Sequence, residues 1–274
     1  MRFAANHGRH WWPAPPLWAG AFAVGLLCGL PAKAQPGGPA VSSATESSAQ
    51  SLMTRGLRAY DAGNNSLAVV VFRQAAAMGA VDAMMYLGVM YGTGRGVDVD
   101  YTSAMAWFRR AADAGNSQAM CNIGLLYYQG LGPAKSYVQA MSWFLKAASF
   151  NNSEATFNVG VLHRDGLGVP VNYAEAMTWF RKAAGERDVT AANAIGVLYQ
   201  QGLGVSVDYA QAMSWYQNAA DAGSGAALYN IGVLWEGGLG VAQDRDQAIA
   251  WYRKAAAAGN ADAKAALKSL GAQD

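Results

Sequence analysis

Residues 83–115 read Ala83-Met-Met-Tyr-Leu-Gly-Val-Met-Tyr-Gly-Thr-Gly-Arg-Gly-Val-Asp-Val-Asp-Tyr-Thr-Ser-Ala-Met-Ala-Trp-Phe-Arg-Arg-Ala-Ala-Asp-Ala-Gly115, and this unit recurs along the chain at a step of 36 residues. The step is kept by a tryptophan row, Trp107, Trp143, Trp179, Trp215 and Trp251. It is also kept by a glycine row, Gly88, Gly124, Gly160, Gly196 and Gly232. No insertion interrupts the five units, so an internal repeat is the dominant structural signal of this sequence.

Each unit predicts two helices joined by a glycine-containing loop. The first runs from Ala83 to about Tyr91, because its apolar residues fall at helical spacing. The second runs from about Tyr101 to Ala114, with Ala104, Trp107, Phe108, Ala111 and Ala112 expected to face inward. Gly88 costs its helix about 1 kcal/mol relative to Ala. Its recurrence in every unit therefore predicts the close approach of another helix backbone.

Residues suited to helix capping support these boundaries. The second helices are preceded by Asp100, Ser136, Asn172, Asp208 and Asp244, and the first helices by Asn116, Asn152, Asp188, Ser224 and Asn260. Glu or Gln follows three residues after four of the five second-helix caps, which predicts capping boxes. Glycine ends most second helices, but Arg187 interrupts that row. We therefore expect Gly185 to end its helix early, and the 185–190 junction to be a weak point or a bend.

The first 34 residues predict a targeting segment. Basic residues precede an apolar run from Leu17 to Leu30, which is shorter than the roughly 20 residues of a membrane-spanning helix. Ala32-Lys33-Ala34 matches a signal-peptidase site, so we expect cleavage after Ala34 and a periplasmic or secreted protein. An uncleaved membrane anchor is the alternative. After cleavage Cys121 would be the single remaining cysteine, so we expect no intramolecular disulfide in the mature chain.

These patterns predict an all-α solenoid of antiparallel helix pairs. We divide the chain into the signal at 1–34, a flexible Pro-, Gly- and Ser-rich linker at 35–50, a degenerate helix pair at 51–79, five repeats at 80–115, 116–151, 152–187, 188–223 and 224–259, and a capping helix with a tail at 260–274. Without the signal, 17 Lys and Arg face 18 Asp and Glu. This balance does not indicate nucleic-acid binding, which needs an excess of basic residues, and we expect no membrane association after cleavage.

The unit at 83–115 resembles a Sel1-like repeat, a relative of the tetratricopeptide repeats. The resemblance covers about 80–259 and more weakly the residues from 51 onward. It implies a right-handed superhelix and an adaptor role in protein complexes, often in bacterial envelope signalling or polysaccharide export. One exported, cysteine-rich branch is described as β-lactamase-like and carries a disulfide in each repeat. This sequence lacks those cysteines, so neither the disulfides nor that activity carries over.

The residue inventory predicts a protein that is not an enzyme. After the signal the chain has one histidine, His163, and one cysteine, Cys121. These are too few for a zinc site, and we expect both side chains to have packing roles. The Gly-x-Gly pairs lack the lysine and the strand context of a phosphate-binding loop. We therefore assign no catalytic residue, no metal and no cofactor.

A binding face is expected where the repeat varies, which is on three rows of the first helices. The first row is Met85, Cys121, Phe157, Asn193 and Tyr229; the second is Tyr86, Asn122, Asn158, Ala194 and Asn230; the third is Gly92, Tyr128, Arg164, Gln200 and Glu236. We place a concave partner-binding surface at Asn122, Asn158, Asn230, Tyr128, Phe157, Arg164, Tyr229 and Glu236. The asparagine amides could bond the backbone of an extended peptide, and the alternative is that they bond between neighbouring helices.

A basic row on the second helices, Arg110, Lys146, Lys182 and Lys254, could meet an acidic partner or could be a solvated face. The leading hypothesis is an exported protein–protein interaction scaffold that binds a protein partner or a peptide segment in its concave groove. The envelope polysaccharide machinery is one candidate source of that partner. The alternatives are an enzyme acting on cell-wall or β-lactam substrates, and a carbohydrate-binding module that uses Tyr128, Phe157, Tyr229 and Trp235 for stacking.

Overall fold

The computed structural model describes residues 43–272, with side chains from Ser48 onward. The described part of the chain is all-α, as expected, and contains no strand. Its helices are α2 (Ser43–Asp61), α3 (Asn65–Ala77), α4 (Val81–Thr93), α5 (Tyr101–Asp113), α6 (Ser117–Gln129), α7 (Tyr137–Ala148), α8 (Ser153–Asp165), α9 (Tyr173–Gly185), α10 (Val189–Gln201), α11 (Tyr209–Asp221), α12 (Gly225–Gly237), α13 (Arg245–Ala257) and α14 (Ala261–Ser269). The proposed signal at 1–34 lies outside the described residues. Among the described helices, none is both long and apolar enough to cross a membrane.

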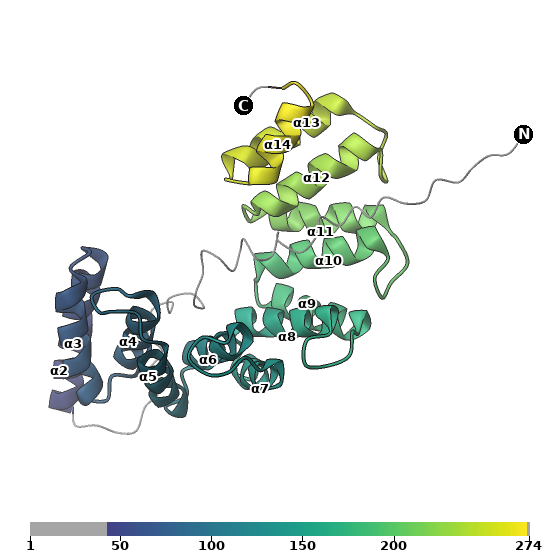
Figure 1. Ribbon diagram of the computed structural model, residues 1–274. Helices are drawn as coiled ribbons and strands as arrows, with labels where there is room; N and C mark the ends of the chain where they lie inside the picture. The colour runs from purple at the N-terminus through teal and green to yellow at the C-terminus, as the bar shows by residue number, and fades with distance from the viewer. Residues whose placement is uncertain (1–42, 273–274) are drawn as a thin grey trace, which may run out of the picture. The chain divides into compact units, whose positions relative to one another are not determined.

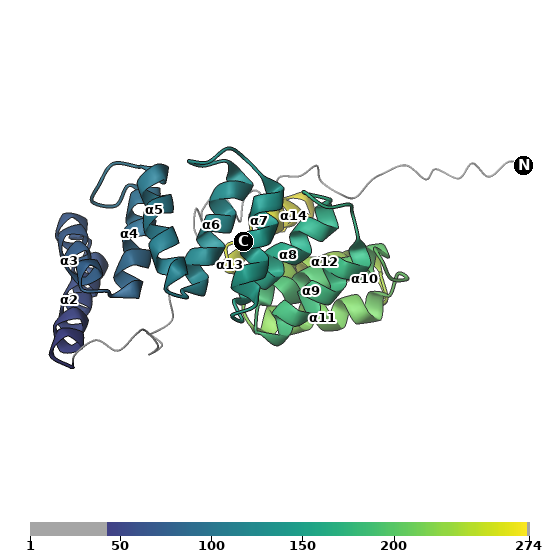
Figure 2. The ribbon, with the colours of Figure 1, turned by 90° about the horizontal axis from the view of Figure 1, so that it is seen from below.

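The chain divides into two compact units, Met1–Ala114 and Gly115–Asp274. In the first unit, α2 packs on α3, α3 on α4, and α4 on α5. In the second unit the pairs α6/α7, α8/α9, α10/α11 and α12/α13 follow one another, and α14 packs against α13 (Figure 1). In the view from below, α4 lies beside α5, and α6 lies beside α7 (Figure 2). Successive helix pairs packed in this way form a repeat solenoid, which confirms the predicted fold class.

Two expected boundaries need correction. Helix α2 begins at Ser43, so residues 43–50 are helical and not part of a linker. The sequence from Ser43 to Asp61 contains no proline, and Gly56 is its only glycine, so nothing breaks the helix before the turn at Gly63. Helix α9 does not end early: it has 13 residues, as do α5 and α11. The helix before the 185–190 junction therefore has the regular length. The irregular feature of the junction is the positive φ of Arg187.

The expected helix caps are formed. Asp100, Ser136, Asn172, Asp208 and Asp244 each accept a hydrogen bond from the backbone N–H three residues later. The first-helix caps do the same, as in the 2.8 Å bond from Ala119 N to Asn116 Oδ1. These bonds satisfy amide groups that a helix start leaves without an intrahelical partner.

The second half of the predicted capping box is wrong. In a capping box, the N-cap backbone N–H donates to the Glu or Gln side chain three residues later. In this chain that N–H donates instead to a carbonyl near the end of the preceding first helix, for example Asn172 N to His163 O at 2.8 Å and Asp208 N to Tyr199 O at 3.0 Å. The bond spans nine residues, so it closes the loop of each repeat and fixes how the second helix enters.

Each glycine of the first-helix row faces an aromatic ring on the paired second helix. We call this contact the ring seat. A Cβ placed on Gly88, Gly124, Gly160, Gly196 or Gly232 would lie 2.4–2.6 Å from the ring of Phe108, Phe144, Phe180, Tyr216 or Tyr252, respectively. The prediction of a close approach was correct, but the approaching group is an aromatic ring and not a helix backbone. Gly56 and Phe72 repeat the arrangement in α2 and α3, which identifies that degenerate pair as a structural relative of the full repeats.

The tryptophan row is less buried than expected. Trp107, Trp143, Trp179, Trp215 and Trp251 are all half-buried, whereas the aromatic residue that follows each of them is at most 1% exposed. The ring that fills the core of each pair is therefore that of Phe108 and its equivalents. Trp215 and Trp251 both pack against the core cluster that contains Tyr216.

We expect Arg187→Gly to stabilise the protein. Arg187 has a φ of +70° at a position where Gly79, Gly115, Gly223 and Gly259 are found in other pairs. A left-handed conformation costs a non-glycine residue about 1–2 kcal/mol, so removing the Arg187 side chain should raise the free energy of unfolding by about 1 kcal/mol. Urea denaturation followed by circular dichroism measures the change.

Gly223→Ala is the matched control. Gly223 has a φ of +89°, and a Cβ there would meet nothing within 4 Å, so the variant should lose stability through backbone strain alone. A decrease or no change in stability for Arg187→Gly would contradict the prediction.

We expect Gly160→Ala to destabilise the second unit by about 1–3 kcal/mol, because the new methyl group would overlap the Phe180 ring at 2.6 Å. Gly185→Ala is the control, since its Cβ would have no neighbour within 4 Å. Thermal unfolding of both variants, and of Gly160→Ala combined with Phe180→Leu, tests the ring seat. Equal stability of the two single variants would show that the ring does not require glycine.

Candidate partner-binding face

The eight candidate residues lie on three first helices of the second unit. Helix α6 carries Asn122 and Tyr128, helix α8 carries Phe157, Asn158 and Arg164, and helix α12 carries Tyr229, Asn230 and Glu236. We call this set the first-helix face. None of its members comes from α10, whose side chains in the three rows are Asn193, Ala194 and Gln200.

Half of the first-helix face is buried in the 274-residue chain. Asn122, Phe157, Asn158 and Arg164 are 0%, 7%, 5% and 8% exposed. Tyr128, Tyr229, Asn230 and Glu236 are half-buried and present part of their surface. The expected continuous open surface is therefore limited, in this chain, to the end of α6 and to α12.

The asparagines bond at least partly within the stack. Asn230 on α12 donates from Nδ2 to Oδ1 of Asn193 on α10 at 2.9 Å, and Asn193 is only 3% exposed. A comparable link joins α8 to α6, where Asn152 Nδ2 donates to Gln118 Oε1 at 3.2 Å. For Asn230, bonding between neighbouring helices is thus the observed role. A buried amide left without a partner would cost about 1–3 kcal/mol, so these links hold successive repeats together.

Glu236 and Gln200 accept hydrogen bonds from the hydroxyl groups of two core tyrosine rings. The Tyr252 hydroxyl donates to Glu236 Oε2, and the Tyr216 hydroxyl donates to Gln200 Oε1, both at 2.5 Å. The other three repeats have phenylalanine in the ring row and Gly92, Tyr128 or Arg164 in the acceptor position. The chain therefore places an amide or carboxylate acceptor 16 residues before the ring in the two repeats whose ring carries a hydroxyl. This pairing was visible in the sequence but was not recognised there.

A polar cluster joins the ends of α6 and α8. Arg164 donates from Nε and Nη2 to the two carboxylate oxygens of Asp165 at 2.6 and 2.8 Å. Tyr128 packs edge-on against Tyr137 at a ring separation of 5.3 Å. Burial, and then the negative charge of Asp165, raise the pKa of Tyr128. Because Asp165 neutralises Arg164, the guanidinium is a weak candidate for binding an external anion.

The remaining aromatic candidates also contact the core rings. Phe157 lies 5.3 Å from the Phe180 ring, and Tyr229 lies 5.4 Å from the Tyr252 ring. Both therefore extend the ring seat of their own repeat outward. Of the two, Tyr229 retains the larger exposed surface.

The basic row on the second helices covers the tryptophan row. The cationic groups of Arg110, Lys146, Lys182 and Lys254 lie 4.4, 5.0, 5.3 and 3.9 Å from the ring centres of Trp107, Trp143, Trp179 and Trp251. Such cation–π contacts contribute about 0.5–1 kcal/mol each at exposed sites. The row thus has a structural role on a solvated face, as in the second of the two interpretations.

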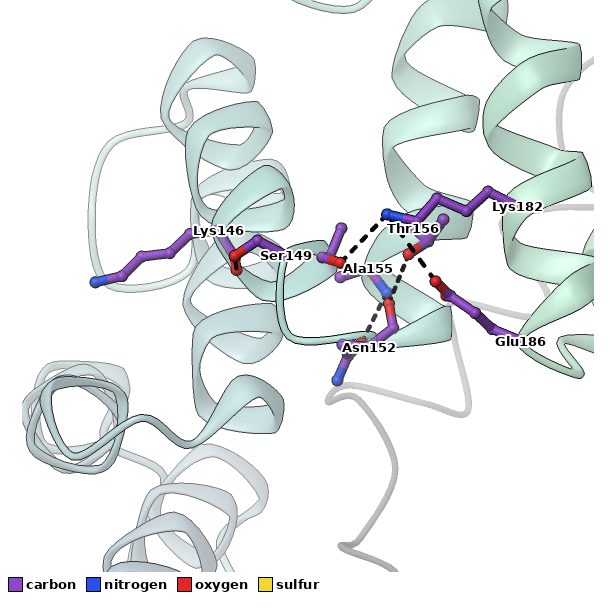
Figure 3. Close-up of polar contacts among 8 residues, drawn as sticks. Lys146, Ser149, Asn152, Ala155, Thr156, Lys182 and Glu186 are labelled. Atoms are coloured by element: carbon purple, nitrogen blue, oxygen red, sulfur yellow. Dashed lines mark hydrogen bonds and ion pairs between the residues drawn. The ribbon is translucent and has the colours of Figure 1, made fainter. Parts of the chain in front are cut away.

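Lys182 has a further role at a repeat junction. Its Nζ donates to the carbonyl of Ala148 at the end of α7 at 3.4 Å, and lies 4.0 Å from Glu186 Oε1 (Figure 3). Ser149 and Asn152, drawn in the same view, complete the turn between α7 and α8 through bonds to Lys146 O and Ala155 N. A cation at the carbonyl end of α7 is favoured by the helix dipole.

The residues considered for chemistry occupy packed positions. Cys121 is fully buried on α6 and is disulfide-bonded. The expectation of no disulfide concerns the cleaved chain and stays a prediction. His163 is half-buried, and its Nδ1 has no hydrogen-bond partner among the described residues. Within residues 43–272 no three His, Cys, Asp or Glu side chains are grouped so that they could hold a metal.

We expect the protein to lose stability as the pH rises above 10. Burial raises the pKa of Tyr86 to about 12, and it also raises the pKa values of Tyr216 and Tyr252. The unfolded chain therefore releases these protons at a lower pH than the folded chain, so stability is full below pH 10 and falls above it. Tyr86→Phe should recover about 2 kcal/mol of the loss by pH 12, measured by urea denaturation from pH 8 to 12. Parallel pH curves for the variant and the parent would contradict this.

The repeat is shared with known proteins. A Sel1 repeat family model matches residues 81–116, 117–149, 153–186, 189–224 and 225–260. A Sel1 repeat protein from Oxalobacter formigenes is 34% identical, with a TM-score of 0.74 over 79% of this chain and 89% of that chain. A protective antigen of uropathogenic Escherichia coli strains that displays an SLR fold is 33% identical, with a TM-score of 0.69 over 83% of this chain and 50% of that chain. No curated protein sequence matches. The chain belongs to the Sel1 repeat family.

Proposed function

We propose that this protein is an exported scaffold that binds a protein partner through the open part of its first-helix face. Sel1 repeats generally mediate protein–protein interactions, and the five repeats here form the helical solenoid on which such binding depends. Tyr128, Tyr229, Asn230 and Glu236 are the half-exposed members of that face.

The half-exposed tyrosines carry the proposal. Tyr128 and Tyr229 each pack against a neighbouring aromatic ring, at 5.3 and 5.4 Å between ring centres, and each is half-buried, so part of its side chain remains exposed. A ring held in this way loses little conformational entropy when a partner covers it, and tyrosine is among the residues that contribute most at protein interfaces. Neither position is conserved between the repeats, so the solenoid itself does not require a tyrosine there.

Export is the second part of the proposal. The apolar run from Leu17 to Leu30 and the site at Ala32-Lys33-Ala34 support cleavage after Ala34, which would place the scaffold and its partner in the periplasm or outside the cell. N-terminal sequencing of the protein recovered from the periplasm of the producing bacterium tests it. A first residue of Gln35 is expected, and a mature chain that retains Met1 would refute export with cleavage.

We expect a photo-reactive amino acid at Tyr128 or at Tyr229 to cross-link a partner in the envelope, whereas one at Ser214, which is exposed on α11, should not. With the partner purified, Tyr229→Ala should weaken binding about tenfold, because a large desolvated contact is lost. Ser214→Ala should bind as the parent does, and circular dichroism should show the same helix content for all variants. Equal cross-linking from Ser214, or unchanged affinity of Tyr128→Ala and Tyr229→Ala, would refute binding at this face.

A further inference from the structure

Helix α7 differs from every other second helix in its outer surface. Val138, Leu145 and Phe150 are 62%, 41% and 54% exposed. We call these three side chains the α7 patch. Val138 and Leu145 are seven residues apart on one side of the helix, and Phe150 lies in the turn that ends it. Exposed apolar side chains grouped in this way indicate an interaction site more often than isolated ones do.

The other four full repeats have no such patch. Val138 is replaced by Thr102, Ala174, Ala210 and Asp246; Leu145 by Arg109, Arg181, Gln217 and Arg253; and Phe150 by Ala114, Glu186, Ala222 and Ala258. The solenoid therefore does not need an apolar side chain at any of the three positions.

No change elsewhere in the repeat compensates for Leu145. At the equivalent position Arg181 donates from Nη2 to the hydroxyl of Tyr199 on the next helix, at 2.8 Å. In the repeat that contains α7, Leu145 occupies the position of Arg181, and on the following helix His163 occupies the position of Tyr199. This repeat therefore lacks both the arginine–tyrosine hydrogen bond to the next helix and the positive charge of the arginine. An exposed leucine stands in the arginine position.

The charge around the patch is equally distinctive. Residues 114–153 contain no Asp or Glu, whereas each of the other four repeats contains three or four. Lys135 and Lys146 flank the patch and are exposed, and their Nζ atoms lie 4.8 and 5.0 Å from the ring centres of Tyr137 and Trp143. Both lysines thus lie near patch residues in the sequence and have no acidic residue in their own repeat.

We propose that the α7 patch is a second docking site, and that its occupant is a partner segment in which apolar side chains are flanked by acidic ones. The apolar side chains would cover Val138, Leu145 and Phe150, and the carboxylates would lie against Lys135 and Lys146. Because this site is on the outer side of a second helix, it is separate from the first-helix face and does not depend on the function proposed for that face.

The test uses two matched variants of the chain from Gln35 to Asp274. The first, Val138→Ala with Leu145→Arg and Phe150→Ala, gives α7 the side chains that sister repeats already carry at these positions. The second, Ala210→Val with Gln217→Leu and Ala222→Phe, places the same apolar side chains on α11, in a repeat with three acidic residues and no basic one. Circular dichroism should show the parent helix content for both.

A phage-displayed library of random 16-residue peptides is selected on the parent after depletion on the first variant. Enriched peptides should combine apolar with acidic residues. A synthetic enriched peptide should bind the first variant about tenfold more weakly than the parent, gain nothing from the graft on α11, and bind the parent less tightly as salt is added. It should bind Tyr128→Ala and Tyr229→Ala as it binds the parent, which separates this site from the first-helix face.

Three results would overturn the inference. The first is a selection that yields no peptide that distinguishes the parent from the first variant, or only basic peptides. The second is a dimer in sedimentation that the first variant abolishes, which would assign the patch to a second copy of the chain. Flotation with phosphatidylglycerol vesicles that the first variant abolishes would assign it to a lipid surface.

Discussion

The contact between an aromatic ring and a glycine is the constraint on which each repeat depends. The rings of Phe108 and its equivalents lie where a methyl group on the facing glycine would overlap them. The ring thus fixes the distance between the two helices of a pair, and it fixes their register because it fits at one residue only. A glycine in mid-helix costs about 1 kcal/mol, and burial of the ring returns more than that, since a buried phenylalanine contributes about 1.5–3 kcal/mol.

Polar contacts then set the geometry around this seat. The N-cap residue of each second helix makes two hydrogen bonds. Its side chain accepts from a backbone N–H of its own helix, and its backbone N–H donates to a carbonyl of the first helix. Between repeats, Asn230 bonds to Asn193 and Lys182 reaches the carbonyl of Ala148. The contacts between repeats span 37 and 34 residues, about one repeat, so each repeat is supported mainly by itself and by its neighbours.

The fold could be predicted from the sequence because its signals are local and repeated. The row from Gly88 to Gly232 and the caps such as Asn172 fixed the helix boundaries within a few residues. The sequence could not reveal that the partner of Gly88 is a ring, or that the N–H of Asn172 leaves its own helix, because both contacts depend on how the pair packs. The candidate site was less predictable. Variation between repeats was taken as a sign of exposure, yet Asn122 and Asn158 are buried.

Variation between repeats therefore has two physical origins. Where a second position changes with the first, as Glu236 does with Tyr252 and Gln200 with Tyr216, the pair restores a hydrogen bond and the variation is structural. Where no second change restores a contact, the altered side chain keeps its exposed surface and its contribution must be sought outside the chain. Leu145 belongs to the second kind, since the arginine it replaces elsewhere bonds a tyrosine that is also missing. In a solenoid whose repeats are held by the same ring and glycine, uncompensated changes of this kind are a sharper guide to function than variability alone.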